Sequence, residues 1–168
     1  MRILAICGSL QARSANLTLL QDAAASAPEG VEVPIFDGLG DLPHFNPDLD
    51  PTPAVHRWRR ALAESDGVLV ASPEYGHSLP GVLKNGIDWV IGSGELEGKI
   101  VAITAAVGSS DRGLRGLKAL RDTLGAVSAT IVGGEPIVRG AGFEQDVASL
   151  MRALIREIAS RLRVAGPH

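Results

Sequence analysis

Short apolar runs alternate with longer amphipathic segments along the chain, and this alternation restricts the fold more than any other feature. The runs expected to form strands are residues 3–7, 31–36, 67–71, 99–105 and 129–133. The segments expected to form helices are residues 14–25, 54–64, 80–91, 113–124 and 143–162. A repeated strand–helix order predicts an α/β fold, in which a parallel sheet is covered by helices on both faces.

Five strands joined by helices fit two doubly wound arrangements, and hydrophobic periodicity alone does not choose between them. One is the flavodoxin-like strand order 2-1-3-4-5, and the other is a Rossmann order. The chain has 168 residues and no internal repeat, so residues 1–168 are expected to form a single domain. In the first helix, Leu17, Leu20 and Ala24 are expected to share the buried face.

Charge and cysteine content limit the partners and the compartment. The formal net charge is −3, which argues against nucleic acid and anionic membrane surfaces as partners. The only cysteine, Cys7, lies in the first apolar run and is expected to be a buried, inert thiol, which fits a reducing compartment. No apolar run approaches the ~20 residues of a membrane span, and the first run is too short for a signal peptide. The cytoplasm is therefore the expected location.

The segment after the third predicted strand, residues 73–89, reads PEYGHSLPGVLKNGIDW and joins a polar turn to a helix. Pro80 suits the first helical turn, where its missing N–H has no intrahelical partner to lose. A strand, a turn and a helix in succession build the ligand crevices of open α/β sheets. Tyr75 offers a flat face to an aromatic ligand. The alternative interpretation is a rigid turn with an exposed tyrosine.

Residues 8–16, GSLQARSAN, connect the first predicted strand to the first helix. Gly8 allows the backbone to turn sharply and to approach a ligand closely. Ser9, Ser14 and Asn16 lie beside a helix N-terminus, where free amides and the helix dipole attract phosphate, and Arg13 adds positive charge. The alternative is that Ser14 only caps the helix.

Residues 107–113, VGSSDRG, follow the fourth strand at the same edge of the predicted sheet. Ser109 and Ser110 are candidate ligand contacts, and the alternative is a plain connection in which Asp111 caps the next helix. The sequence contains no histidine or cysteine pair at metal-ligand spacing, so no metal is expected. It also lacks the G-x-S-x-G elbow of serine hydrolases.

Two of these segments resemble motifs of the NADPH-dependent FMN reductases, the flavodoxin-like group that includes quinone, azo and chromate reductases. Residues 73–89 are similar to that family's flavin-contacting segment, PEYxxSxPGxLKNxIDW. Residues 8–16 are similar to its phosphate loop, GSxRxxSxN, and residues 42–49 to its LPLYNxDLE segment. Gln11 stands where the family carries arginine, and Gly76 where it commonly carries asparagine. Losing a charge-assisted hydrogen bond of about 1.5–3 kcal/mol at Gln11 predicts weaker, exchangeable FMN.

The resemblance implies a flavodoxin-like three-layer fold with strand order 2-1-3-4-5, bound FMN, and NADPH or NADH as electron donor. It also implies a homodimer or a dimer of dimers. The residues expected to bind the cofactor are Ser9, Gln11, Arg13, Ser14, Asn16, Pro73, Glu74, Tyr75, Gly76, His77, Ser78, Ser109 and Ser110.

The favoured hypothesis is an NAD(P)H oxidoreductase that passes a hydride to FMN. The flavin then reduces a small-molecule acceptor, namely a quinone, an azo compound, a metal oxyanion or free flavin, in a ping-pong mechanism. Because the cofactor carries the chemistry, no protein base is required, and Glu74 is expected to be structural or to contact another subunit. The alternatives are a flavin-binding electron carrier without efficient NAD(P)H turnover and a flavin-free interaction protein.

Overall fold

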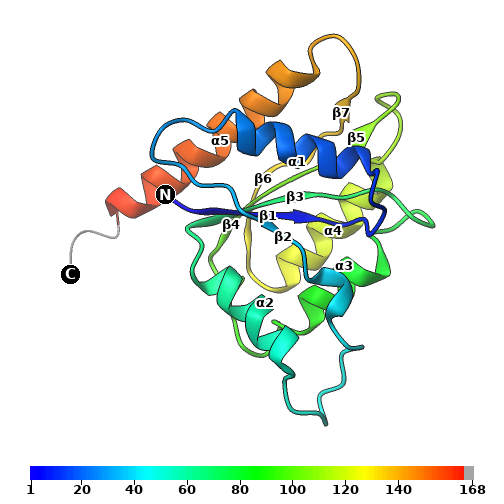
Figure 1. Cartoon of the computed structure of the whole chain (residues 1–168), viewed down its shortest axis with the longest axis vertical. Coiled ribbons are helices and arrows are strands. Elements are labelled where there is room, and N and C mark those ends of the chain that lie inside the picture. The colour runs from blue at the N-terminus through cyan, green and yellow to red at the C-terminus, as the bar shows by residue number, and fades with distance from the viewer. Residues whose placement is uncertain (165–168) are drawn as a thin grey trace.

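Five parallel strands form the central sheet in the order β2-β1-β3-β4-β6 (Figure 1). The computed structural model describes residues 1–164. The strands of the sheet are β1 (Ile3–Cys7), β2 (Ile35–Phe36), β3 (Gly67–Ala71), β4 (Ile100–Thr104) and β6 (Thr130–Gly133). This is the predicted flavodoxin-like order. Its fifth strand is numbered β6 because a separate two-residue strand, β5 (Ala106–Val107), precedes it and pairs with β7 (Ile137–Val138).

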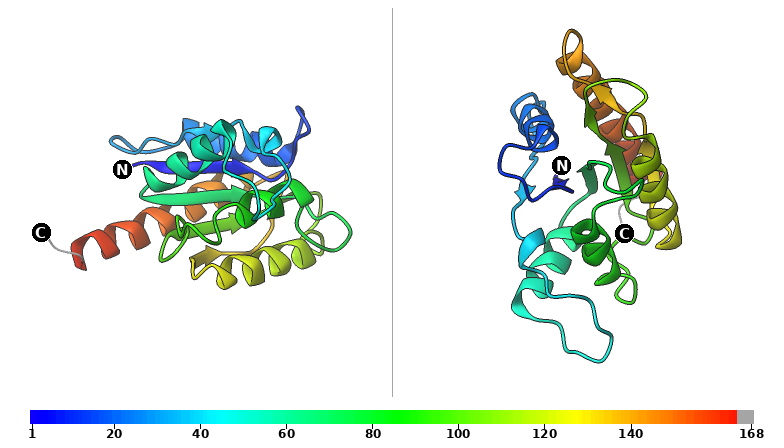
Figure 2. Two further views of the ribbon diagram at one scale, coloured as in Figure 1. Left: turned by 90° about the horizontal axis from the view of Figure 1, so that it is seen from below. Right: turned by 90° about the vertical axis from the view of Figure 1, so that its right-hand side faces the viewer.

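Helices cover both faces of the sheet (Figure 2). They are α1 (Ala15–Ala25), α2 (Pro53–Ala63), α3 (Gly81–Asp88), α4 (Leu114–Ala126) and α5 (Phe143–Val164), with a short 3₁₀ helix, η1 (Leu39–Asp41). Alternate residues of β1 point to opposite faces, as the pleat of a strand requires. Ile3 and Ala5 pack with α1 and α5, whereas Leu4 and Ile6 pack with α2, α3 and α4.

The structure corrects the expected second strand, residues 31–36, which is regular only over β2. The segment before β2 still runs beside β1, because Ile3 N–H donates to the carbonyl of Glu32 and Ala5 N–H to that of Pro34. Pro34 has no N–H to return, so the ladder of paired bonds stays incomplete there. Glu32 N–H does donate to the Met1 carbonyl at 2.9 Å, so the pairing is interrupted only at Pro34.

The buried face of α1 also differs from the predicted set of Leu17, Leu20 and Ala24. Its buried residues are Asn16, Leu19, Leu20 and Ala23. The polar Asn16 belongs to this face because its side-chain oxygen accepts a hydrogen bond from Ala106 N–H in β5, at 2.9 Å. Apolar spacing alone does not reveal such a polar anchor.

All five strands of the sheet are parallel, so their carboxyl ends meet at one edge. The segments that leave β1, β3 and β4 at this edge are residues 8–16, 72–79 and 105–113, called loop one, loop two and loop three below. Cys7, the last residue of β1, is buried beneath this edge, as expected.

Candidate functional site

Loop two forms a two-residue hairpin. The backbone amides of Tyr75 and Ser78 each donate to the other residue's carbonyl at 3.0 Å. The two residues between them, Gly76 and His77, have φ values of 57° and 63°. Two successive left-handed residues are what the tightest hairpin turns require, and glycine and asparagine suit them best. Gly76 therefore keeps the backbone conformation that an asparagine would adopt at the same position.

Glu74 connects loop two to α4. Its carboxylate accepts a hydrogen bond from Gly116 N–H, in the first turn of α4, at 2.9 Å. A Cβ on Gly116 would lie 2.9 Å from the Glu74 Cβ, so glycine permits this approach. A carboxylate at a helix N-terminus is favourable, since it satisfies a free amide and opposes the helix dipole. The geometry agrees with the structural role expected for Glu74.

His77 projects from the hairpin toward the same helix. Its Nδ1 lies 3.9 Å from Glu74 Oε1, and its ring contacts the Arg115 guanidinium. The side chain is nevertheless well exposed, at 65%. His77 therefore lies at the mouth of the site, in contact with a carboxylate and a guanidinium.

Three polar side chains of loop one, those of Ser9, Ser14 and Asn16, are buried and hydrogen-bonded within the protein. Ser14 caps α1 by accepting a bond from Asn16 N–H at 3.2 Å, and Ser9 Oγ accepts from Gln11 N–H at 3.2 Å. Ser9 Oγ also lies 3.4 Å from the Tyr75 hydroxyl, which brings loops one and two together. The capping role of Ser14 is thus confirmed.

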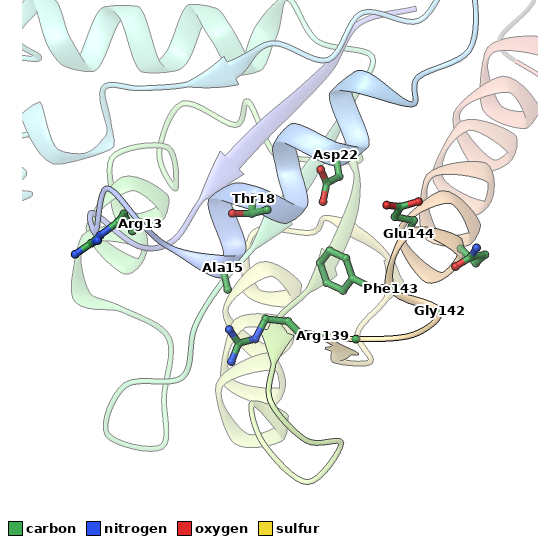
Figure 3. Close-up of a pocket in the computed structure, with 10 residues that line it drawn as sticks. Arg13, Ala15, Thr18, Asp22, Arg139, Gly142, Phe143 and Glu144 are labelled. Atoms are coloured by element: carbon green, nitrogen blue, oxygen red, sulfur yellow. The ribbon is translucent and has the colours of Figure 1, made fainter.

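Gly8 allows loops one and two to approach each other closely. A Cβ at this position would lie 2.7 Å from Ser72 Oγ, a distance that side chains essentially never show. Beyond the buried serines, Gln11 and Arg13 are exposed. In Figure 3, the Arg13 side chain points outward, away from Arg139 and Phe143.

A cleft of about 760 Å³ lies between loops two and three. Its lining residues are Pro73, Glu74, His77, Ala106, Val107, Gly108, Asp111, Arg112, Gly113, Leu114, Arg115 and Arg139. The structure therefore brings Pro73, Glu74 and His77 of loop two against loop three. The other predicted residues of loop two, and those of loop one, are not among the residues that line this cleft. Arg139, which follows β7, escaped the sequence analysis because it belongs to none of the three loops and to no motif.

Ser109 and Ser110 are not among the residues that line this cleft. A hydrogen bond from the Ser109 side chain is the main cause that lowers the pKa of Asp111 from its usual value of 3.8. Asp111 does not cap the next helix, because the N-cap residue of α4 is Gly113, which has a φ of 82° and makes no side-chain cap. The carboxylate at the start of α4 comes from Glu74 instead.

The residues around the cleft fit FMN. A volume of about 760 Å³ lies in the range of cofactor pockets. Gly108, which is exposed, leaves loop-three backbone accessible to a flat ring. Cations for a phosphate lie close by, because Arg139 lines both this cleft and a neighbouring groove against α1.

The second half of the 73–89 segment binds the long connection between β2 and α2. Trp89 is 2% exposed, and its indole N–H donates to the Pro43 carbonyl at 2.7 Å. Asn85 donates to the same carbonyl at 2.9 Å and accepts from Phe45 N–H at 2.8 Å. Lys84 pairs with Asp88 at 2.6 Å, as their spacing predicts. These residues fasten the long connection between β2 and α2.

The described residues hold no cluster of three or more His, Cys, Asp or Glu side chains that would suit a metal ion. None of the helices within residues 1–164 combines the length and apolarity needed to cross a membrane.

Comparison with known proteins adds a family match. A sequence profile described as NADPH-dependent FMN reductase matches residues 1–142. An NAD(P)H-dependent FMN reductase of Pseudomonas aeruginosa is 38% identical over 128 residues, which cover 73% of this chain and 69% of that protein. A 2-hydroxy-1,4-benzoquinone reductase of a Burkholderia species is 38% identical over 91 residues, covering 53% of this chain and 49% of that protein.

The fold resembles that of a solved flavoenzyme. FerB, an NAD(P)H:(acceptor) oxidoreductase from Paracoccus denitrificans, superposes with a TM-score of 0.75 at 26% identity. The match covers 92% of this chain and 97% of FerB.

Proposed function

The chain belongs to the NADPH-dependent FMN reductase family, whose enzymes are oxidoreductases that use FMN and NAD(P)H, and from this we propose its reaction. The chain would hold FMN, which when bound would supply hydride transfer from NAD(P)H and then electron transfer to a small-molecule acceptor. The proposed acceptors are a quinone, an azo compound, a metal oxyanion or free flavin. The whole chain, residues 1–168, acts as a single domain.

The cleft between loops two and three carries this proposal. Pro73 and Glu74 form one wall, and Gly108 and Gly113 contribute to the other. FMN supplies the hydride chemistry when it is bound, since the cofactor and not a side chain carries out the redox step. The chain's part is to bind the ring, to orient it and to leave one side open to substrates.

Each loop has a distinct proposed role. The backbone of loop two and the Tyr75 side chain, which is 53% exposed, contact the ring. Loop three approaches the ring through Gly108, and Ser109 and Ser110 remain proposed contacts. Loop one binds the phosphate through backbone amides near Ser9 and Ser14, whose side chains hold the loop in shape.

Visible spectroscopy tests the proposal. The protein is mixed with FMN, passed through a desalting filter, and then titrated with NADPH or NADH without oxygen. Flavin absorbance that stays with the protein and bleaches with a nicotinamide supports the reductase. Retained flavin that NAD(P)H does not bleach would indicate an electron carrier. No retained flavin at saturating FMN would refute both.

The proposed kinetic order is ping-pong, because donor and acceptor both need access to the ring through one cleft. Initial rates measured at several fixed quinone concentrations while NADPH is varied should give parallel double-reciprocal lines. Intersecting lines would require both substrates to bind together and would contradict a shared site.

We also propose a homodimer or a dimer of dimers in the cytoplasm. The apolar residues of α3 and its end do not support this, because Leu83, Ile87, Trp89 and Val90 are buried within the chain. Ile91 and Leu49, which are 58% and 57% exposed, are better candidates for a subunit contact. Light scattering during size exclusion gives the mass directly, and a monomer at every concentration would refute the dimer.

A further inference from the structure

Arg139 lies where two hollows meet. It lines the cleft between loops two and three, and it also lines a groove of about 660 Å³ between α1 and the start of α5. Figure 3 shows its guanidinium next to Ala15, the first residue of α1, on the side facing the groove. The side chain thus lies between loop one and loop three.

The backbone that carries Arg139 is held firmly at this edge. Its N–H donates to the Val107 carbonyl at 2.9 Å, directly after the β5–β7 pair. The guanidinium Nη2 lies 3.7 Å from the point that a Cβ of Gly108 would occupy. Within residues 1–164 its side chain makes no hydrogen bond or ion pair, so the guanidinium is available to an external anion.

The charges at the helix starts differ in a way that favours an anion here. α4 has the Glu74 carboxylate at its N-terminus, and α5 has Glu144 and Asp146 in its first turn. Glu144 and Asp22 also line the groove, at the α5 side and further along α1. α1 has no acidic residue in its first turn. A cation near the positive end of an uncompensated helix is unfavourable until an anion binds between them.

We propose that Arg139 binds the phosphate of FMN and so makes the site select FMN over riboflavin. This inference rests on the proposed function. A guanidinium forms charge-assisted hydrogen bonds with phosphate that a neutral amide does not match. In this chain Gln11, on loop one, is neutral, and Arg139 would supply a guanidinium beside Ala15, the first residue of α1.

Other arginines near the site are less suited to this role. Arg13 also lines the groove, but it is exposed and in Figure 3 its side chain points away from Arg139. Arg115 contacts His77 at the mouth of the other cleft. Arg139 combines a held backbone, a position beside α1 and a guanidinium without a protein partner.

The test compares the affinities of flavin-free protein for FMN and for riboflavin, which lacks the phosphate. Quenching of flavin fluorescence measures both without any turnover. Arg139→Gln should weaken FMN binding about 10- to 100-fold, as expected for one lost charge-assisted bond. Riboflavin binding should stay the same, and Gln11→Arg should restore part of the FMN affinity in the Arg139→Gln protein.

Two matched variants remove the same charge elsewhere. Arg60→Gln, on the distant end of α2, should leave both affinities unchanged, and Arg13→Gln should change FMN binding less than Arg139→Gln does. Unchanged FMN binding in Arg139→Gln, or an equal loss of FMN and riboflavin, would overturn the proposal. Wild-type protein that binds neither flavin would instead refute the proposed function.

Discussion

The two halves of the 73–89 segment look like one motif in the sequence but have different roles in the fold: the first borders the cleft, and the second packs in the core. The first half, residues 73–79, is exposed or half-buried, contains two left-handed residues and contributes Pro73, Glu74 and His77 to the cleft. The second half, from Gly81 to Trp89, contributes Leu83, Ile87 and Trp89 to the core. Its polar groups bond the Pro43 and Phe45 backbone rather than facing the cleft.

Within seventeen consecutive residues, one part is therefore expected to affect ligand binding and the other to affect the stability of the fold. The turn is proposed to contact the ligand, so changes there should alter ligand affinity or local backbone strain. The helix secures the connection between β2 and α2 through Asn85 and Trp89, so changes there should alter the free energy of unfolding. A strong sequence match across the whole segment therefore does not mean that every matched residue contacts the cofactor.

The largest effect is expected in the helix half. Trp89→Ala removes a buried ring, its edge-on contact with Phe45 and its bond to the Pro43 carbonyl. The free energy of unfolding should fall by about 3–5 kcal/mol, as for other buried aromatic residues. Urea denaturation measures this. Trp89→Phe is the control and should lose less, and a loss below about 1 kcal/mol in Trp89→Ala would contradict the division of roles.

His77 offers a smaller effect in the turn half. Because its φ is 63°, a β-branched residue there should be strained, and His77→Val should destabilise the protein by about 1–2 kcal/mol. His77→Gly adopts this φ without strain and serves as the matched variant. Thermal unfolding should rank glycine above valine. Equal stability of the two variants would show that the hairpin relaxes to another turn.

A substitution of Tyr75 should change FMN affinity while leaving the free energy of unfolding nearly unchanged. Tyr75→Ala should change the unfolding free energy by less than about 1 kcal/mol, since the side chain is 53% exposed. FMN affinity should fall about 2- to 10-fold, as expected for an aromatic contact of roughly 0.5–1.5 kcal/mol. Fluorescence titration measures the affinity, and Tyr75→Phe should retain most of it. A Tyr75→Ala protein that binds FMN normally would remove this side chain from the proposed ring contacts.

The smallest expected effect is a pH-dependent contribution of Asp111, in loop three, to the stability of the fold. The Ser109 hydrogen bond lowers the pKa of Asp111 from 3.8 in the folded state. The folded state therefore holds the proton less tightly than the unfolded state. The resulting stabilisation is present above pH 3.8 and is lost as the pH falls through the lower folded value. In an NMR titration of the carboxyl carbon, Ser109→Ala should return the pKa toward 3.8. An unchanged pKa would show that Ser109 is not the cause.

The sheet was predictable because each of its buried strands is a continuous apolar run. Pro34 shortened β2, since the loss of one N–H matters more than apolar character at that edge. The β5–β7 pair was not predicted, because strands of two residues carry no period. Arg139 was missed for the same reason, as its position depends on that pair and not on any motif.

In loop one, the sequence predicted the right residue types but not how they are used. Ser14 and Asn16 were expected near the phosphate, and the structure shows that their side chains shape the loop from within. Short polar side chains serve as caps and as ligand contacts equally well by composition. Only the hydrogen-bond partners of such side chains in the fold show whether they cap a helix or contact a ligand.

The bond between Asn16 and Ala106 joins positions 90 residues apart in the chain. Loop one is therefore synthesised early but is fastened only after β4 and β5 have formed beside it. Closing so long a stretch of chain costs conformational entropy before the contact repays it. Loop one, where the phosphate is proposed to bind, should accordingly be among the last parts to become rigid, so that flavin retention would report the completion of folding as well as the presence of a binding site.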